Sequence, residues 1–347
     1  MSRPFQHCPP CVPQVSAVLL TYNCASFVRE AIRSVFGQDW AEPLEVIVSD
    51  DASTDGTYDI VCSEASAYRG PYAVKLRQRQ ANSGSKSAHL NDVLPSVTGD
   101  IIVSFDADDV SEKSRIRRIA GTFRRPGVQA VYSACSTIDG LGRPWGRGRV
   151  PHPPPGAHAP DWFARADAYA SGATLAVRRA VFEAFGPLDP GIYEDVVLPF
   201  RASLLGDIVY IDEPLVRFRR HAASLTADMD RFASMRAYRN RLYWGIERAR
   251  KSAQSRLEDI AKASERMPSR AAEFARLRAV VADSLAKAEL SAQLVDPSLV
   301  RRTSALLRLA RSGAYREDFL QHIALALVPA CYLRYKRRAL GIAAEGD

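Results

Sequence analysis

Short apolar runs alternate with segments of helical periodicity along the first two thirds of the chain. Residues 15–20 form a mostly apolar run typical of a buried strand, and it ends at the polar sequence Thr21-Tyr22-Asn23. Apolar residues then recur at helical spacing over 27–35, and a second apolar run follows at 46–48. This order predicts a β-α-β unit with two parallel strands.

The same alternation continues to about residue 225. Further candidate strands lie at 74–76 and 101–105, and each precedes a segment with helical spacing. Shorter strands are predicted at 173–177, 208–211 and 215–218, with helices at 179–185 and after Tyr193. Repeated strands and helices predict an α/β fold, a Rossmann-like and mostly parallel sheet with helices on both faces.

Two changes of composition divide the chain. Residues 139–160 are rich in glycine and proline, which predicts a long mobile loop. From residue 226 on, Ala, Arg, Glu and Leu dominate and predict helices, interrupted at Pro268, Pro297 and Gly313. We therefore expect a flexible tail at 1–14, an α/β domain at 15–225 and a C-terminal α-helical region at 226–347.

The net charge of +8 is distributed unevenly. From Arg301 to the end there are nine basic and four acidic residues, which favours an anionic partner such as lipid headgroups over nucleic acid. An apolar segment at 319–328 precedes the basic, aromatic sequence at 332–338. This region is expected either to lie against an anionic membrane surface or to pack on the rest of the protein or a second copy.

No targeting or membrane-spanning signal is visible in the sequence. No apolar stretch reaches about 18 residues, and the first residues lack a basic start followed by an apolar run. Six irregularly spaced cysteines indicate reduced thiols, and Cys8 and Cys11 form one C-x-x-C pair without a partner pair. We expect a cytoplasmic protein whose membrane contact is at most peripheral.

Polar side chains follow three of the predicted strands. These sequences are Thr21-Tyr22, Asp50-Asp51 and Asp106-Ala107-Asp108-Asp109. Ligands of open parallel sheets bind beyond the carboxyl ends of the strands, so we expect the three sequences to meet in one crevice. Crowded carboxylates are typical ligands of hard cations such as Mg²⁺ or Mn²⁺, which in turn bind diphosphates. Taken singly, each acid could instead cap a helix or lie in a solvated turn.

Other phosphate-binding and metal motifs fit poorly. Gly84-Ser85-Lys86-Ser87 contains the Lys-Ser of a P-loop, but it lacks the first glycine and does not directly follow a strand. The glycines at 140–146 miss the G-x-G-x-x-G spacing by one residue, and no Cys/His cluster has zinc spacing. These motifs therefore do not compete with the carboxylates at the strand ends.

Taken together, the ordered motifs resemble the inverting family 2 glycosyltransferases of the bacterial surface-polysaccharide type, which have the GT-A fold. The matching segments are 18–23, 46–53, 82–91, 99–109, 194–201 and 212–225. One departure is His89-Leu90-Asn91-Asp92, which stands where many relatives carry Arg-Asn-x-Gly. The Pro-rich segment at 139–160 has no counterpart in the pattern.

The resemblance implies an activity and a set of site residues. A sugar would move from a nucleoside diphosphate sugar to a hydroxyl of a glycan or lipid-linked glycan acceptor, at the inner face of the cytoplasmic membrane. The implied residues are Asp195 as general base, Thr21, Tyr22, Asp51 and Asp106 at the nucleotide sugar, Glu194 at the acceptor, and Asp108 and His221 at a divalent metal, Mg or Mn.

Two other functions stay open from the sequence. The same sheet edge could serve a sugar-phosphate nucleotidyltransferase, which would release pyrophosphate. Alternatively, the chain could be a non-catalytic subunit that binds a nucleotide sugar and acts through its C-terminal helices in an assembly.

Overall fold

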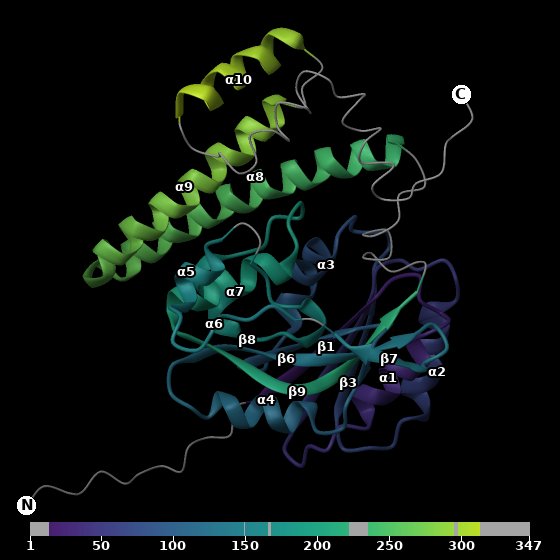
Figure 1. Cartoon of the computed structure of the whole chain (residues 1–347). Helices are drawn as coiled ribbons and strands as arrows, with labels where there is room; N and C mark the ends of the chain where they lie inside the picture. Colours follow the sequence, from purple (N-terminus) through teal and green to yellow (C-terminus); the bar gives the residue numbers. More distant parts are fainter. Residues whose placement is uncertain (1–13, 149, 166–167, 222–234, 295–297, 313–347) are drawn as a thin grey trace, which may run out of the picture. The chain divides into compact units, whose positions relative to one another are not determined.

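A computed structural model describes residues 14–148, 150–165, 168–221, 235–294 and 298–312, whose backbone is drawn in Figure 1. The chain divides into two compact units. The first contains the residues up to Arg220 together with 261–268, and the second contains 221–260 and the residues from 269 on. Cys8, Cys11 and the apolar and basic segments predicted after residue 313 lie outside the described residues.

One nine-stranded sheet forms the centre of the first unit, in the order β3-β2-β1-β4-β8-β6-β9-β5, with β7 paired to β6. Strands β3, β2, β1 and β4 are parallel, as predicted, whereas β8 runs antiparallel to both β4 and β6. The strands are β1 Val15–Thr21, β2 Leu44–Asp50, β3 Ala73–Gln78, β4 Ile101–Asp106, β5 Val110–Ser111, β6 Val128–Asp139, β7 Pro144–Arg147, β8 Ala176–Arg178 and β9 Asp207–Arg220.

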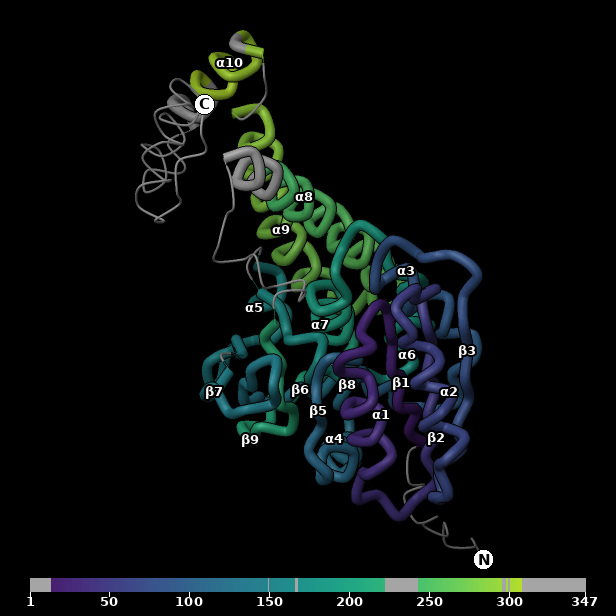
Figure 2. The backbone as a smooth tube through the Cα atoms, turned by 90° about the vertical axis from the view of Figure 1, so that its right-hand side faces the viewer, coloured from purple at the N-terminus to yellow at the C-terminus, as the bar shows by residue number. Residues whose placement is uncertain are grey.

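Helices cover both faces of this sheet, as predicted. Alternate residues of β1, which are Val15, Ala17 and Leu19, join apolar residues of α1 and α4 in one buried cluster. Figure 2 shows α3 and α7 on one side of the sheet and α4 on the other. The helices are α1 Val28–Phe36, α2 Thr57–Ala67, α3 Lys86–Val93, α4 Arg115–Phe123, α5 Ala159–Phe163, α6 Arg179–Phe185 and α7 Glu194–Leu205, with short 3₁₀ turns at Leu94–Ser96 and Gly172–Thr174.

The prediction of a long mobile loop over 139–160 is wrong at both ends of that segment. A turn after Asp139 leads directly into β7, which pairs antiparallel with β6, and α5 begins at Ala159. The Asp139 carboxylate accepts hydrogen bonds from the backbone amides of Leu141 and Arg143, both at 2.9 Å. All four residues of β7 are exposed, so the strand has no alternation of apolar and polar residues that would reveal it in the sequence.

The described part of the C-terminal region is helical, as predicted. It contains α8 Met235–Arg266, α9 Ala271–Leu294 and α10 Leu299–Ser312, with a 3₁₀ turn at Pro268–Arg270 where Pro268 was expected to interrupt the helix. Leu290 and Leu294 of α9 form a small core with Ala305 and Leu306 of α10. Among the helices described, none has both the length and the apolar character needed to cross a membrane.

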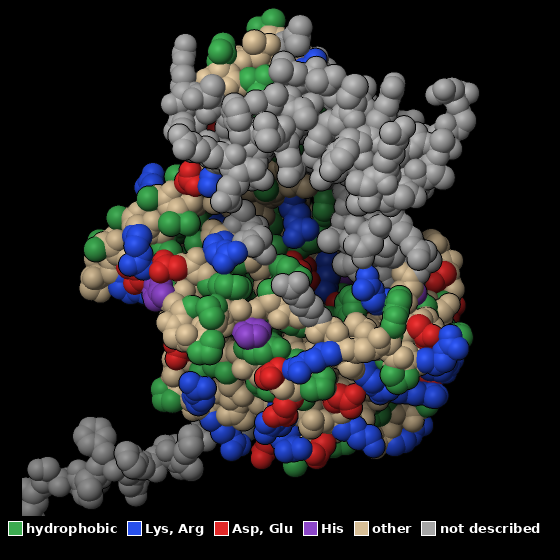
Figure 3. Space-filling view, in the orientation of Figure 1, with side chains coloured by type: hydrophobic (Ala, Val, Ile, Leu, Met, Phe, Trp, Pro, Cys, Tyr) green, Lys and Arg blue, Asp and Glu red, His purple; other side chains and the backbone are tan. Residues whose placement is uncertain are grey.

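Charged side chains of both signs are mixed on the first unit. On the face seen in Figure 3, Lys and Arg side chains alternate with Asp and Glu across the described residues of this unit. The described cysteines, Cys24, Cys62 and Cys135, are free thiols.

Candidate functional site

The carboxyl ends of three parallel strands meet at one edge of the sheet. Strand β1 lies between β2 and β4, and their register places Thr21 beside Asp50 and Leu20 beside Asp106. The buried Thr21 hydroxyl donates a hydrogen bond of 2.7 Å to the Asp50 carboxylate. The structure therefore brings together the polar sequences that follow these strands.

The loops after β1 and β2 are bound to each other by hydrogen bonds. The Asn23 side-chain oxygen accepts from the backbone amide of Thr54, and the Ser53 hydroxyl accepts from the amide of Asn23, both at 2.9 Å. Asn23 and Ala52 have φ angles of 46° and 59°, in the left-handed region, which asparagine tolerates but alanine rarely adopts. Strained backbone held in place by its surroundings is typical of ligand-binding loops.

Asp51 is buried at this edge and anchors the loop that follows β3. Its carboxylate accepts hydrogen bonds from the Ser83 amide at 2.8 Å, the Ser83 hydroxyl at 2.6 Å and the Asn82 side-chain amide at 3.1 Å. Arg79 forms an ion pair with it at 3.1 Å. Tyr22 follows β1 at the same edge with 51% of its surface exposed, so its ring is available to a ligand.

After β4 the chain makes a turn that separates three carboxylates. The amide of Asp109 donates to the carbonyl of Asp106 at 3.3 Å, and Asp106 and Asp108 are half-buried whereas Asp109 is buried. One oxygen of Asp109 accepts from the amide of Arg219 at 2.7 Å. Burial and the neighbouring carboxylates Asp108 and Asp106 raise the pKa of Asp109 well above its ordinary value.

Two buried guanidinium groups hold this turn and its strand. Arg219 donates to the carbonyl oxygen of Asp108 at 2.9 Å and forms an ion pair with Glu30. Arg115 donates to the carbonyl oxygens of Ser104 and Ala173, both at 2.7 Å, and burial lowers its pKa to about 10. Sequence analysis did not identify Arg115, although an arginine on the apolar face of its helix was a visible signal.

Lys86 connects the turn after β4 to the start of α7. Its ammonium lies 2.5 Å from an oxygen of Asp106 and 2.7 Å from an oxygen of Glu194. Burial lowers the pKa of Lys86, but the two carboxylates outweigh this effect and hold the pKa above its ordinary value, so the ammonium stays charged. Sequence analysis examined Lys86 only as part of a P-loop and missed this role.

Asp195 and Glu194 occupy the first turn of α7. Glu194 is buried and reaches the sheet edge through Lys86. Asp195 follows it and is half-buried, and its carbonyl oxygen accepts from the amide of Ala170 at 2.9 Å. The structure thus connects the acceptor-side acids of the sequence pattern to the same edge as Asp51 and Asp106.

The chemistry of the turn after β4 fits a divalent cation that is shared with a substrate. Among the described residues, no group of three or more His, Cys, Asp or Glu side chains is arranged to hold a metal ion alone. Mg²⁺ is usually bound by one or two carboxylates together with substrate phosphates, and Asp106 and Asp108 offer such oxygens. His221 begins the second unit, so its relation to Asp108 stays a prediction.

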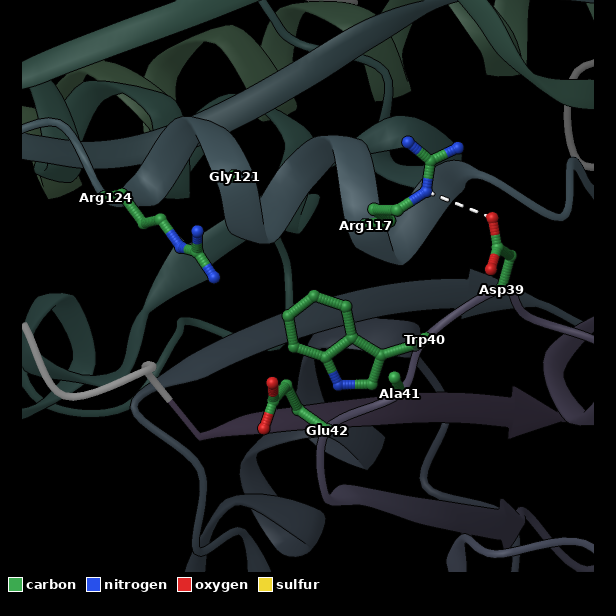
Figure 4. A pocket seen from close by; sticks show the side chains of 7 residues that line it. All are labelled: Asp39, Trp40, Ala41, Glu42, Arg117, Gly121 and Arg124. Carbon is green, nitrogen blue, oxygen red and sulfur yellow. Dashed lines mark hydrogen bonds and ion pairs between the residues drawn. The ribbon is translucent and has the colours of Figure 1, made fainter.

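A cavity of about 350 Å³, drawn in Figure 4, is lined by residues from outside this edge. It is formed by the loop that precedes β2 and by α4, so it lies at the amino end of the parallel strands. Arg117 and Asp39 on its rim form an ion pair at 3.1 Å. The cavity contains none of the predicted site residues; its lining is Asp39, Trp40, Ala41, Glu42, Arg117, Gly121 and Arg124.

Comparisons with known proteins show which family this chain resembles. Residues 16–186 match the family model described as Glycosyl transferase family 2. An uncharacterized glycosyltransferase of Nostoc sp. is 28% identical over 217 residues, which are 61% of this chain and 66% of the relative. The putative glycosyltransferase EpsE of Bacillus subtilis is 34% identical over 131 residues, 38% of this chain and 46% of EpsE. The chain thus spans less than two thirds of these relatives.

The fold is also that of a solved glycosyltransferase. The crystal structure of Staphylococcus aureus TarS residues 1–349 in complex with UDP-GlcNAc superposes with a TM-score of 0.53 at 17% identity. The superposition covers 96% of this chain and 94% of the TarS chain. The predicted GT-A fold is confirmed.

Proposed function

We propose that this chain, whose residues 16–186 match the model of glycosyl transferase family 2, moves a sugar from a nucleoside diphosphate sugar to a hydroxyl of a glycan or lipid-linked glycan, with inversion at the anomeric carbon. The observation that carries the proposal is the shared sheet edge. Thr21, Asp51 and Asp106 follow three parallel strands there, and Lys86 connects Asp106 to the acids that begin α7.

On the donor side, Thr21, Tyr22 and Asp51 would bind the nucleotide, with Asp51 accepting a hydrogen bond from the base. Asp106 would lie near the ribose or the metal, and Asp108 would hold a divalent cation, Mg²⁺ or Mn²⁺, with His221 as a further ligand. When bound, the cation would neutralise charge on the diphosphate leaving group. The likeness of the fold to TarS, whose structure contains UDP-GlcNAc, supports a donor of this class.

On the acceptor side, Asp195 would act as general base and Glu194 would orient the acceptor. The carboxylate of Asp195 takes the proton of the acceptor hydroxyl while that oxygen forms a bond to the anomeric carbon. The bond between the anomeric carbon and the diphosphate oxygen breaks on the opposite face, and its electron pair leaves with the nucleoside diphosphate. One such displacement inverts the configuration, and the base contributes about 10²- to 10⁴-fold.

The proposal also covers the setting of the reaction. A lipid-linked acceptor in cell-surface polysaccharide biosynthesis would be reached at the inner face of the cytoplasmic membrane. The nine basic residues from Arg301 to the end support a peripheral contact of the C-terminal helical region with anionic lipid, and the same helices could pair with a second copy.

Nucleotide binding provides the first test. Thermal stabilisation is measured with UDP, GDP, dTDP and CDP, with and without Mn²⁺, for the wild type, Asp108→Asn and Asp39→Asn. Asp39 is an exposed acid at the opposite end of the strands and serves as the matched control. We expect one nucleotide to stabilise the wild type and the control in a metal-dependent way, and Asp108→Asn to lose this effect.

Turnover provides the second test. The nucleotide sugars that correspond to the stabilising nucleotide are incubated with the protein, and hydrolysis and transfer are followed for the wild type and Asp195→Asn. We expect Asp195→Asn to lower turnover by about 10²- to 10⁴-fold. Pyrophosphate release from a sugar phosphate and a nucleoside triphosphate would favour a nucleotidyltransferase, and binding without any turnover would favour a non-catalytic subunit.

A further inference from the structure

Helix α3 is bound to the segment that leads into α7 at three separate points. The Ser87 hydroxyl donates to the carbonyl oxygen of Ile192 at 2.5 Å. The Asn91 side chain forms two hydrogen bonds of 2.8 Å with the backbone of Leu188, one as donor and one as acceptor. The third contact is the ion pair between Lys86 and Glu194 at 2.7 Å. The helix that follows the donor-side loop therefore supports the acceptor-side helix.

Lys86 is the member of this set that also reaches the end of β4. Its ammonium contacts Asp106 and Glu194 at once, and both carboxylates are largely withdrawn from water, with 22% and 5% of their side chains exposed. Gly172 lies beside this ion pair: a Cβ atom at this position would be 2.5 Å from the contacting oxygen of Glu194 and 3.4 Å from the Lys86 nitrogen. The Glu194 carboxylate thus packs against the backbone at Gly172 where it contacts Lys86.

We propose that Lys86 is a positioning residue, which fixes the first turn of α7, with Glu194 and Asp195, against the turn that carries Asp106. The inference rests on the proposed function, in which Asp195 is the general base and must be held in place beside the acceptor hydroxyl. Lys86 acts through Glu194 and touches neither reacting atom. It provides the fixed distance between the donor-side and acceptor-side groups that a single displacement requires.

The charges explain why Lys86 keeps the carboxylates of Asp106 and Glu194 close together. Two carboxylates that share one ammonium attract it and are screened from each other, whereas the same pair without the ammonium would repel. Removal of the positive charge leaves two acids with little access to water, and they can relieve the repulsion only by moving apart or by taking up a proton. Because Glu194 begins α7, such a movement displaces Asp195 as well.

The test compares Lys86→Met, Lys86→Arg and Gly172→Ala with two matched controls. Lys75→Met removes another ammonium, which lies 2.5 Å from Glu45 at the far side of the sheet on β3. Gly121→Ala adds a methyl group at a position where nothing lies within 4 Å of it. Each variant is measured for kcat, for the KM of the donor, and for hydrogen exchange of a peptide that covers the first turn of α7.

We expect Lys86→Met to lower kcat by about 10²-fold, since a displacement of about 1 Å has effects of this size, with little change in the KM of the donor. Exchange in the first turn of α7 should become faster. Lys86→Arg should recover part of kcat, and Gly172→Ala should reproduce part of the loss because its methyl group displaces the Glu194 carboxylate. Both controls should match the wild type.

A wild-type kcat in Lys86→Met would overturn the inference, as would unchanged exchange in α7. Loss of nucleotide-induced stabilisation with unchanged exchange would also overturn it, because Lys86 would then act on the donor. If Lys86→Met does not fold, Gly172→Ala decides by the same two measurements. If the wild type turns over no nucleotide sugar, the proposed function fails, and exchange in α7 still decides whether Lys86 positions this helix.

Discussion

Replacement of Arg219 by methionine should destabilise the first unit because its guanidinium group holds several segments together in the interior. The side chain is 2% exposed and donates to the carbonyl oxygens of Asp108 at 2.9 Å and Asp139 at 3.3 Å. A hydrogen bond from a charged donor contributes about 1.5–3 kcal/mol, so the two together give about 3–6 kcal/mol. The ion pair with Glu30 adds at most about 1 kcal/mol, because the Glu30 side chain is 51% exposed.

The free energy of unfolding is best measured by guanidinium chloride denaturation with tryptophan fluorescence in a Trp244→Phe background. The remaining tryptophans, Trp40, Trp145 and Trp162, all belong to the first unit, so the signal reports on that unit alone. Arg217→Met is the matched control. Its side chain is 40% exposed and forms an ion pair with Glu112 at 3.2 Å, which contributes about 0–1 kcal/mol.

We expect Arg219→Met to lower the denaturant concentration at the midpoint of unfolding strongly, without a change in the dependence of the unfolding free energy on denaturant. Arg219→Lys should lower this midpoint less, and Arg217→Met should leave it near that of the wild type. Lysine keeps the charge but cannot reproduce the forked donor geometry. Equal midpoints for Arg219→Met and Arg217→Met would refute the reasoning, because the carbonyl oxygens at Asp108 and Asp139 would then not depend on the guanidinium group.

Three further predictions concern other parts of the first unit. Gly121→Ala should stabilise the first unit by about 0.5–1 kcal/mol in the same denaturation experiment. Alanine has a higher helix propensity than glycine in the interior of α4, and no atom outside the helix backbone lies within 4 Å of the added methyl group. Hydrogen bonds from Arg33 hold the pKa of Glu64 in the folded protein below its ordinary value of 4.5. The ionised Glu64 carboxylate therefore contributes stability above about pH 4.5, and this contribution should be lost as the pH falls through the lowered pKa. Glu64→Gln should make the acid side of the stability curve flatter, and an unchanged curve would contradict this assignment. Burial raises the pKa of Cys24 to about 12, so its thiol should resist DTNB at about pH 8 until the protein unfolds; mass spectrometry that finds Cys24 modified in the native protein would show that the thiol is accessible.

Several features of the fold could be read from local pattern. The apolar runs that became β1, β2 and β4 alternate with helices, and a crossover helix leaves consecutive strands parallel. Strand β7 could not be predicted, because its four residues are exposed and its stability comes from pairing with β6 and from the turn at Asp139. A strand shows alternating apolar and polar residues only when one of its faces is buried, so an edge strand without a buried face shows no such alternation.

The candidate site divides in the same way. Thr21, Asp51 and Asp106 could be placed at one edge because each follows a parallel strand, and the carboxyl ends of such strands meet. The connection from Asp106 through Lys86 to Glu194 could not be predicted from the sequence, because these residues lie far apart in the chain and no motif spacing links them. Arg115 and Arg219 carry charges that sequence patterns assign to the surface, yet both are buried.

The sequence by itself determined the α/β class, the parallel half of the sheet and the acids at its edge, because these follow from residue order and from the direction of the strands. Only the tertiary structure decided which charges pair in the interior and which helix supports which. Such contacts join residues whose distance along the chain is unrelated to their distance in space, and burial strengthens them after the fold has brought them together.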